Sequence, residues 1–157
     1  MADVVNIEKD LQKTEDNTSI RDARLFIDSP GGDAFSGLAL SDVIIAAQKR
    51  GWTITGDAMG IIASAAVPIF AVCKPRLAAP GTIFMVHEAA LWKWPGRETS
   101  SDIRAQNELM VTLQDRYLSY LVNNSNLSLE EWQAKEKATT WFDSEKAKEW
   151  GLVDEIR

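Results

Sequence analysis

Residues 23–33, ARLFIDSPGGD, decide the fold. The apolar run at 23–27 predicts a strand, and Pro30-Gly31-Gly32 breaks it. Residues 34–49 then place apolar side chains on one helical face, and Gly51 follows as a helix stop. A strand, a glycine turn and a helix in this order predict a βα unit, the building block of a parallel sheet.

The rest of the chain continues this alternation. Helical spacing of apolar residues predicts a helix in the first dozen residues, and polar residues predict a loop over 14–22. The further predicted elements are a strand at 52–55, a buried helix followed by a strand within 60–72, a strand at 83–86, a long helix at 101–123, a helix with a capping box that starts at Ser128, a short helix at 144–151 and a strand at 152–156. The order predicts parallel strands in an α/β fold.

The composition limits the function. The chain has 157 residues, which fits a single domain of 1–157. The net charge is −6 and the basic residues are scattered, so we expect no nucleic-acid partner. The sequence has no signal peptide and no apolar stretch that could span a bilayer, so we expect no membrane association and a cytoplasmic location. The apolar neighbours of the single cysteine, Cys73, favour a buried structural residue over a nucleophile.

Three segments carry candidate chemistry. His87 is the only histidine and ends an apolar run, so it is the only imidazole available for acid–base work near neutral pH. Ser64 lies among alanines, and such small neighbours let an acyl group reach a serine. The turn at Gly31-Gly32 leaves backbone N–H groups unpaired at a helix start, where they can bind an oxyanion or a phosphate. We expect no cofactor and no metal ion.

Each segment alone has a commoner structural interpretation. A Gly-Gly pair is often a plain tight turn, and a serine in a small-residue segment is often a helix cap or a core residue. A lone histidine at a strand end is more often a satisfied core residue than a base. Donors, serine and histidine in this order within one domain favour a serine hydrolase.

The same residues resemble the proteolytic subunit of the Clp protease (ClpP) and its phage and prophage relatives. The resemblance rests on four ordered segments: the strand and Gly-Gly turn at 27–32, the serine segment at 60–66, the histidine strand at 84–87, and a C-terminal signature at 144–154. It extends from about Val4 to the end of the chain.

The resemblance implies a ClpP/crotonase-type α/β fold of stacked βαβ units with a protruding helical handle at about 88–125. It implies a homo-oligomer, usually of heptameric rings, that cleaves peptides or unfolded proteins, with a Clp-type unfoldase ATPase as partner. Ser64 would be the nucleophile and His87 the base, and the N–H groups of Gly32 and Ala65 would form the oxyanion hole.

The sequence departs from the family pattern at the third catalytic position. Counting back from Gly151, and forward from Asp102, places Thr139 where the family has an aspartate. A threonine can accept a hydrogen bond from an imidazole N–H, but it supplies no negative charge for the imidazolium. Glu136 and Asp143 are nearby acids, although neither aligns with the family position.

Two further departures concern assembly. The family has an axial loop and a first strand before the helix that contains Val4, and neither occurs here, so we expect weak coupling to an unfoldase. The glycine-rich part of the handle is replaced by a segment with Trp92 and Trp94, so we expect altered ring stacking, with both tryptophans in packing roles.

Three alternatives stay open at this point. One is a catalytically impaired ring subunit with a structural or regulatory role, which Thr139 motivates. Another is a crotonase-type acyl-CoA enzyme, which shares the fold but leaves the serine and histidine segments unexplained. The last is a phage head-maturation protease with the same Ser–His chemistry.

Overall fold

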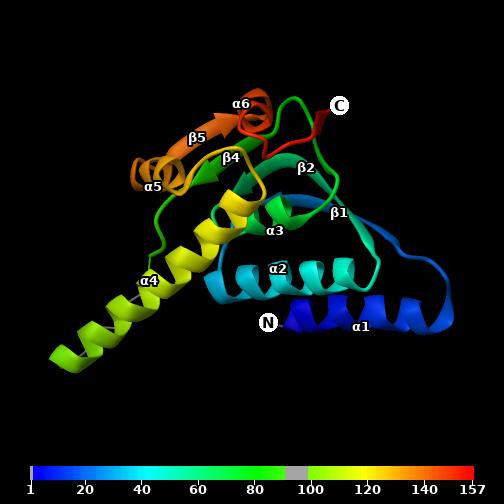
Figure 1. The fold of residues 1–157 in the computed structure, drawn as a ribbon, viewed down its shortest axis with the longest axis horizontal. Helices are drawn as coiled ribbons and strands as arrows, with labels where there is room; N and C mark the ends of the chain where they lie inside the picture. The colour runs from blue at the N-terminus through cyan, green and yellow to red at the C-terminus, as the bar shows by residue number, and fades with distance from the viewer. Residues whose placement is uncertain (1, 91–98) are drawn as a thin grey trace.

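The computed structural model describes residues 2–90 and 99–157, and its elements alternate between helices and strands (Figure 1). In chain order they are α1 (Ala2–Asn17), β1 (Asp22–Ser29), α2 (Ala34–Lys49), β2 (Thr53–Ala63), α3 (Ala66–Val72), β3 (Arg76–Ala78), β4 (Ile83–Val86), α4 (Ser100–Asn123), α5 (Leu129–Lys137), β5 (Thr140–Asp143), α6 (Ser144–Glu149) and β6 (Glu155–Ile156). The predicted α/β fold is confirmed.

Within the described ranges, the strands form one sheet in the order β5-β4-β2-β3-β6, and β1 also pairs with β2. The pairs of β2 with β1, β3 and β4 are parallel. The prediction of parallel strands is wrong for β5, which runs antiparallel to β4. Two helices, α4 and α5, connect β4 to β5. After them the chain enters the sheet in the direction opposite to that of β4.

Some predicted boundaries are corrected. Helix α1 continues through residues 14–17, where a loop was predicted, because Thr14 and Asn17 bond back to backbone carbonyls one turn earlier. Strand β2 continues to Ala63, so residues 60–72 hold a strand end followed by a helix, the reverse of the predicted order. The strands β3 and β5 were missed, since runs of 3 and 4 residues give too little periodicity to detect.

Helix α3 fills the centre of the fold. Its residues Val67, Phe70 and Ala71 are fully buried against the inner sheet residues Ile62 and Phe84. A cluster of aromatic rings continues this core towards the C-terminus, where Trp132, Phe142 and Trp150 contact one another. The apolar helix α3 therefore acts as the support on which the ends of β2 and β4 rest.

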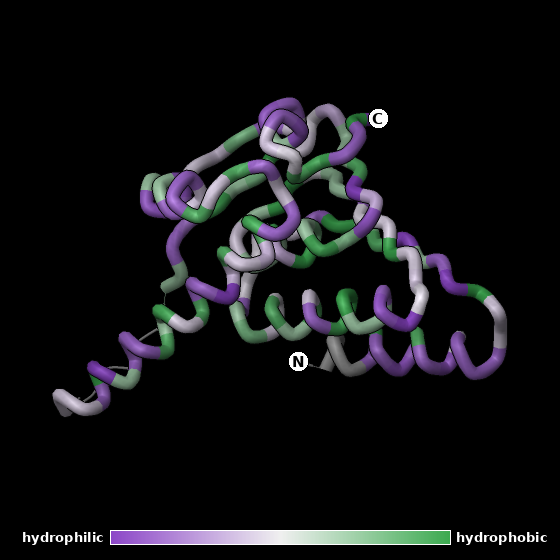
Figure 2. Tube along the Cα trace, viewed as in Figure 1, coloured by the Kyte–Doolittle hydropathy of each residue, from purple (hydrophilic) through white to green (hydrophobic). Residues whose placement is uncertain are grey.

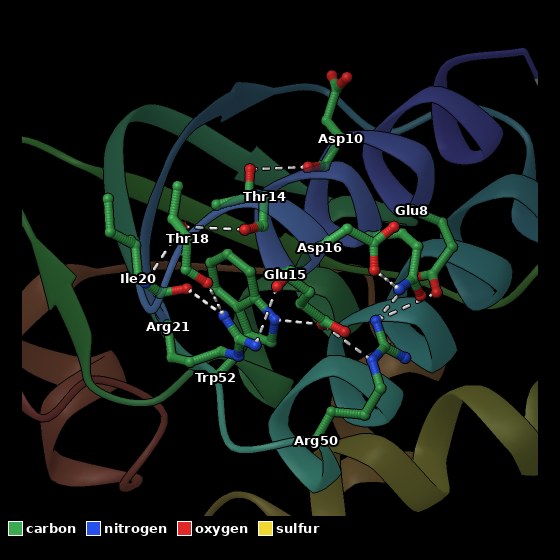
Figure 3. A network of polar contacts seen from close by, with 11 residues as sticks. Glu8, Asp10, Thr14, Glu15, Asp16, Thr18, Ile20, Arg21, Arg50 and Trp52 are labelled. Atoms are coloured by element: carbon green, nitrogen blue, oxygen red, sulfur yellow. Dashed lines mark hydrogen bonds and ion pairs between the residues drawn. The ribbon is translucent and has the colours of Figure 1, made fainter.

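Helix α1 lies along α2 and is much the more hydrophilic of the two (Figure 2). It is held by Glu15, which accepts hydrogen bonds from the Trp52 indole and the Arg50 guanidinium (Figure 3). Helix α4 differs from the other helices, since its N-terminal half extends away from the body of the fold (Figure 1). The predicted handle spans 88–125, of which residues 91–98, with Trp92 and Trp94, lie outside the described residues.

Candidate active site

Three parallel strands deliver the candidate residues to one edge of the sheet. The turn with Gly31 and Gly32 follows β1, Ser64 follows β2, and His87 follows β4. The register pairs Ala63 with Met85, and the Ser64 N–H donates to the Met85 carbonyl at 2.8 Å. Because parallel strands end at the same edge, segments far apart in the sequence meet there.

Ser64 and His87 are in direct contact. The distance from the Ser64 Oγ to the His87 Nε2 is 2.8 Å, which is a hydrogen bond. Both side chains are half-buried, so they remain accessible to a substrate. The sequence predicted that these two residues act as a pair, and the structure brings them together.

The backbone at Ser64 is strained. Its φ is +54°, in the left-handed region that L residues other than Gly, Asn and Asp rarely adopt. This turn separates the end of β2 from α3, and the Tyr117 hydroxyl donates to the Ser64 carbonyl at 3.3 Å. Strained residues of this kind are common at active sites, where the surrounding structure holds them.

The glycine turn after β1 packs against the serine turn. A Cβ on Gly31 would lie 2.6 Å from the Ala63 carbonyl oxygen and 2.7 Å from the Ser64 Cβ, and Gly31 also has a φ of +94°. Only glycine fits this close approach. Within the described residues, the backbone N–H groups of Gly32 and Ala65 donate to no protein acceptor, and both residues line the same cavity as Ser64.

That cavity has a volume of about 640 Å³. Ser64 and His87 line it together with Gln114 and Tyr117 of α4, and its remaining walls are largely apolar: Phe35, Leu38, Pro68, Met110 and Leu113. A peptide-sized group with an apolar side chain would fit such a site.

Thr139 adjoins the end of the strand pairing that leads to His87. The antiparallel register ends with Val86 opposite Thr140, and His87 and Thr139 are the next residue on either side of that pair. The φ of Thr139 is +50°, its side chain is exposed, and among the described residues this side chain makes no hydrogen bond with His87. The second acid that the sequence offered, Asp143, caps α6 by accepting from the Lys146 N–H at 2.8 Å.

Glu136 is the other acid that the sequence offered, and it lies buried beside the cavity wall. One of its oxygens accepts a hydrogen bond from the Gln114 side chain. The pKa of Glu136 is raised to about 8, mainly by burial and also by nearby Glu88, against the lowering effect of the Gln114 hydrogen bond. Burial likewise raises the pKa of the neighbouring Tyr117 hydroxyl.

Sequence reasoning missed Gln114 as a site residue and assigned Tyr117 only to the apolar face of the long helix. The available signal was a glutamine placed between Leu113 and Tyr117 on that face. Cys73 is fully buried, and burial raises the pKa of its thiol to about 12, which agrees with a structural role. Within residues 2–90 and 99–157, no group of acidic, histidine and cysteine side chains could hold a metal ion.

Comparisons with known proteins identify the family of this chain. A family model described as Clp protease matches residues 3–157. The ATP-dependent Clp protease proteolytic subunit 3 of Rhizobium etli is 28% identical over 140 residues, which cover 88% of this chain and 69% of that protein. The ATP-dependent Clp protease proteolytic subunit of Lactococcus lactis subsp. cremoris is 28% identical over 144 residues, covering 90% of this chain and 69% of that protein.

A solved structure of a ClpP1 mutant from Listeria monocytogenes superimposes with a TM-score of 0.82 at 22% identity. The alignment covers 98% of this chain and 83% of that one. At this level of identity the superposition establishes the fold.

Proposed function

The chain belongs to the Clp protease family, and from that premise we propose that it is a serine endopeptidase with Ser64 as nucleophile and His87 as base. The observation that carries the proposal is the 2.8 Å contact between the Ser64 Oγ and the His87 Nε2 at the wall of a largely apolar cavity. Family membership favours this activity over that of a crotonase-type acyl-CoA enzyme, which would leave the contact unexplained.

The proposed reaction is acyl transfer. The Ser64 Oγ attacks the carbonyl carbon of the peptide bond, and the His87 Nε2 takes the hydroxyl proton. His87 then gives that proton to the leaving amine, and a water molecule, activated by the same nitrogen, releases the acyl group from Ser64. In this proposal the N–H groups of Gly32 and Ala65, which donate to no acceptor among the described residues, donate to the oxyanion that forms on the carbonyl.

The exposed face of the sheet supports a ring-shaped homo-oligomer, which we propose is built of heptamers. Large apolar side chains on this face alternate along the strands with buried ones, so they point away from the helices. They are Phe26, Ile83 and Trp141, with exposed fractions of 61%, 41% and 56%. Exposed apolar side chains on one face of a sheet are typical of an interface with another subunit.

We propose peptides and unfolded proteins as substrates, a Clp-type unfoldase ATPase as partner and a cytoplasmic location, with residues 1–157 as a single peptidase domain. In a phage head-maturation protease the same chemistry would act on capsid or scaffold proteins. Among the described residues, no helix is both long and apolar enough to cross a membrane.

A catalytically impaired ring subunit is the second candidate, and Thr139 favours it. Thr139, which adjoins the last pair of the β4–β5 ladder as His87 does, is uncharged, and in the described structure its side chain makes no hydrogen bond with the imidazole. In the serine protease template, loss of the acid lowers the rate by about 10⁴.

The test is intact-mass spectrometry after treatment with a fluorophosphonate, on the wild type, Ser64→Ala and His87→Ala. We expect a single adduct on the wild type, no adduct on Ser64→Ala, and labelling of His87→Ala that is slower by at least about 10². Ser64→Ala is also expected to abolish peptide cleavage without changing the oligomer. Absence of an adduct on folded, assembled wild type would refute the peptidase proposal in favour of the impaired subunit.

A further inference from the structure

Glu136 has an environment that disfavours a charged carboxylate. Its side chain is 1% exposed and lies in the last turn of α5, where the negative end of the helix dipole opposes a further negative charge. Within the described residues, its Oε1 has no hydrogen-bond partner, although a buried polar atom without a partner is costly.

A single side chain connects Glu136 to the segment that carries the base. The backbone N–H of Ala89, two residues after His87, donates to the Gln114 Oε1 at 3.0 Å. A backbone N–H can only donate, so this bond fixes the orientation of the Gln114 amide. The amide NH₂ therefore faces Glu136 and donates to its Oε2.

Residues 87–90, which these hydrogen bonds tie to α4, are not held by the hydrogen bonds of a helix or a strand. Strand β4 ends at Val86, and residues 87–90 belong to no helix or strand. Ladder hydrogen bonds thus fix the backbone up to the residue before His87. Beyond it, the bond from Ala89 to Gln114 ties the segment to α4.

We propose that Glu136 is a positioning residue for the base: through Gln114 it fixes the backbone at Ala89 and thereby holds the His87 ring against Ser64. The inference rests on the proposed Ser64–His87 chemistry. It gives this chain an acidic group that supports His87 from a place other than position 139.

The ionisation of Glu136 should make the rate of Ser64 acylation depend on pH. The groups that face its carboxyl are Gln114 and Tyr117 of α4 and Glu88 beyond β4, while Lys135 and Lys137 flank it on α5. The ionised carboxylate accepts from Gln114 more strongly than the neutral acid does. Ionisation near pH 8 should therefore strengthen the connection through Gln114 and Ala89 and speed acylation of Ser64.

The same shift makes stability depend on pH. The pKa of Glu136 is raised in the folded chain from the ordinary 4.5 to about 8, so the folded state favours the neutral acid. The stabilisation is complete below pH 4.5 and is lost as the pH rises through 8. Glu136→Gln should remove this dependence from the free energy of unfolding.

The test measures the rate of fluorophosphonate labelling per folded molecule across roughly pH 5.5–9.5, in steps of about 1 pH unit. The proteins compared are the full-length wild type, Glu136→Gln, Glu136→Leu and Gln114→Leu. Glu130→Gln is the matched control, because Glu130 is an exposed glutamate of the same helix. Glu136→Leu and Gln114→Leu break the connection, and we expect both to label roughly 10- to 100-fold more slowly.

Glu136→Gln keeps an acceptor for Gln114 but cannot ionise. Its rate relative to wild type should fall as the pH rises through 8, while Glu130→Gln should follow the wild type throughout. A constant ratio of Glu136→Gln to wild type across this range would overturn the inference, and so would leucine variants that label at the wild-type rate. Absence of an adduct on the wild type would refute the proposed function itself, a result distinct from either of these.

Discussion

At the scale of single residues, the site depends on two backbone conformations that L residues rarely adopt. Ser64 and Thr139 are the non-glycine residues of the described chain with positive φ, at +54° and +50°. At Ser64 the left-handed conformation occurs in the residue whose hydroxyl contacts His87, and the proposed chemistry depends on that contact. Thr139 follows the C-cap of α5, a place usually taken by glycine or asparagine, and its branched side chain is poorly suited to it.

This difference leads to a prediction for position 139. Thr139→Asn should raise the free energy of unfolding by about 1 kcal/mol, because asparagine tolerates the left-handed conformation. Thr139→Asp should relieve the same strain and also place a negative charge near His87, so we expect fluorophosphonate labelling at least about tenfold faster than in the wild type.

Thr139→Asn is the matched control for charge, and urea unfolding alongside labelling rates separates the two effects. Equal acceleration by asparagine and aspartate would show that backbone relief, not charge, changes the rate. If neither variant is faster, the side chain at 139 does not act on His87.

At the scale of elements, the active site is assembled where α2 packs against the turn after β2. Gly37 lies in the second turn of α2, and a Cβ there would be 2.8 Å from the Ala65 carbonyl oxygen and 3.0 Å from the Ala65 Cβ. Helix α2 can therefore approach the serine turn only because residue 37 has no side chain. The same approach brings Phe35 and Leu38 into the cavity wall.

Gly37→Ala therefore has an expected effect opposite to its helix propensity. In an exposed helix this change stabilises by about 1 kcal/mol. Here we expect a net loss of roughly 1–3 kcal/mol, because the methyl group overpacks the contact and pushes the Ala65 turn away from α2. Labelling of Ser64 should also slow, since the Ala65 N–H, the proposed oxyanion donor, moves with that turn.

Gly81→Ala is the comparison, because a Cβ at residue 81 would have no atom within 4 Å and Gly81 has no positive φ. Thermal and urea unfolding of both variants measure the effect. Stabilisation by Gly37→Ala would show that the helix and the turn are not in close contact in solution.

At the scale of the whole molecule, the fold buries one face of the sheet and leaves apolar side chains on the other. Helix α3 and the aromatic cluster cover the inner face, whereas Phe26, Ile83 and Trp141 remain exposed on the outer one. A monomer of 17.4 kDa with this surface should associate with further copies.

Phe26→Glu should therefore shift the protein from an oligomer to a species of 17.4 kDa, as measured by analytical ultracentrifugation. A carboxylate at this position would be desolvated if the face were covered by another subunit, and Arg24, whose guanidinium lies 5.1 Å from the centre of the Phe26 ring but already pairs with Asp57, would offset only part of that cost. Ile20→Glu is the control, since Ile20 is 56% exposed but lies in the loop before β1. A wild type that sediments as a monomer, or a Phe26→Glu oligomer of unchanged mass, would contradict the ring proposal.

The sequence by itself determined the α/β class and the helices at 34–49 and 101–123. It also determined the strand at 83–86 and which serine and histidine to pair. These features depend on local periodicity, on capping residues and on the order of motifs, all of which can be recognised in the sequence without the tertiary structure. The end of β2 could not be predicted, because residues 60–63 begin a continuous apolar run, and the periodicity of such a run does not distinguish a buried strand from a buried helix.

Only the tertiary structure decided the environment of the site. The contact between Ser64 and His87 depends on the register that pairs Ala63 with Met85, and the antiparallel pairing of Val86 with Thr140 brings the chain at Thr139 near His87. The sequence offered Glu136 and Asp143 as equivalent acids, yet one is buried beside the cavity and the other caps α6. Burial and hydrogen-bond partners arise from segments far apart in the chain, so no local pattern could distinguish the two.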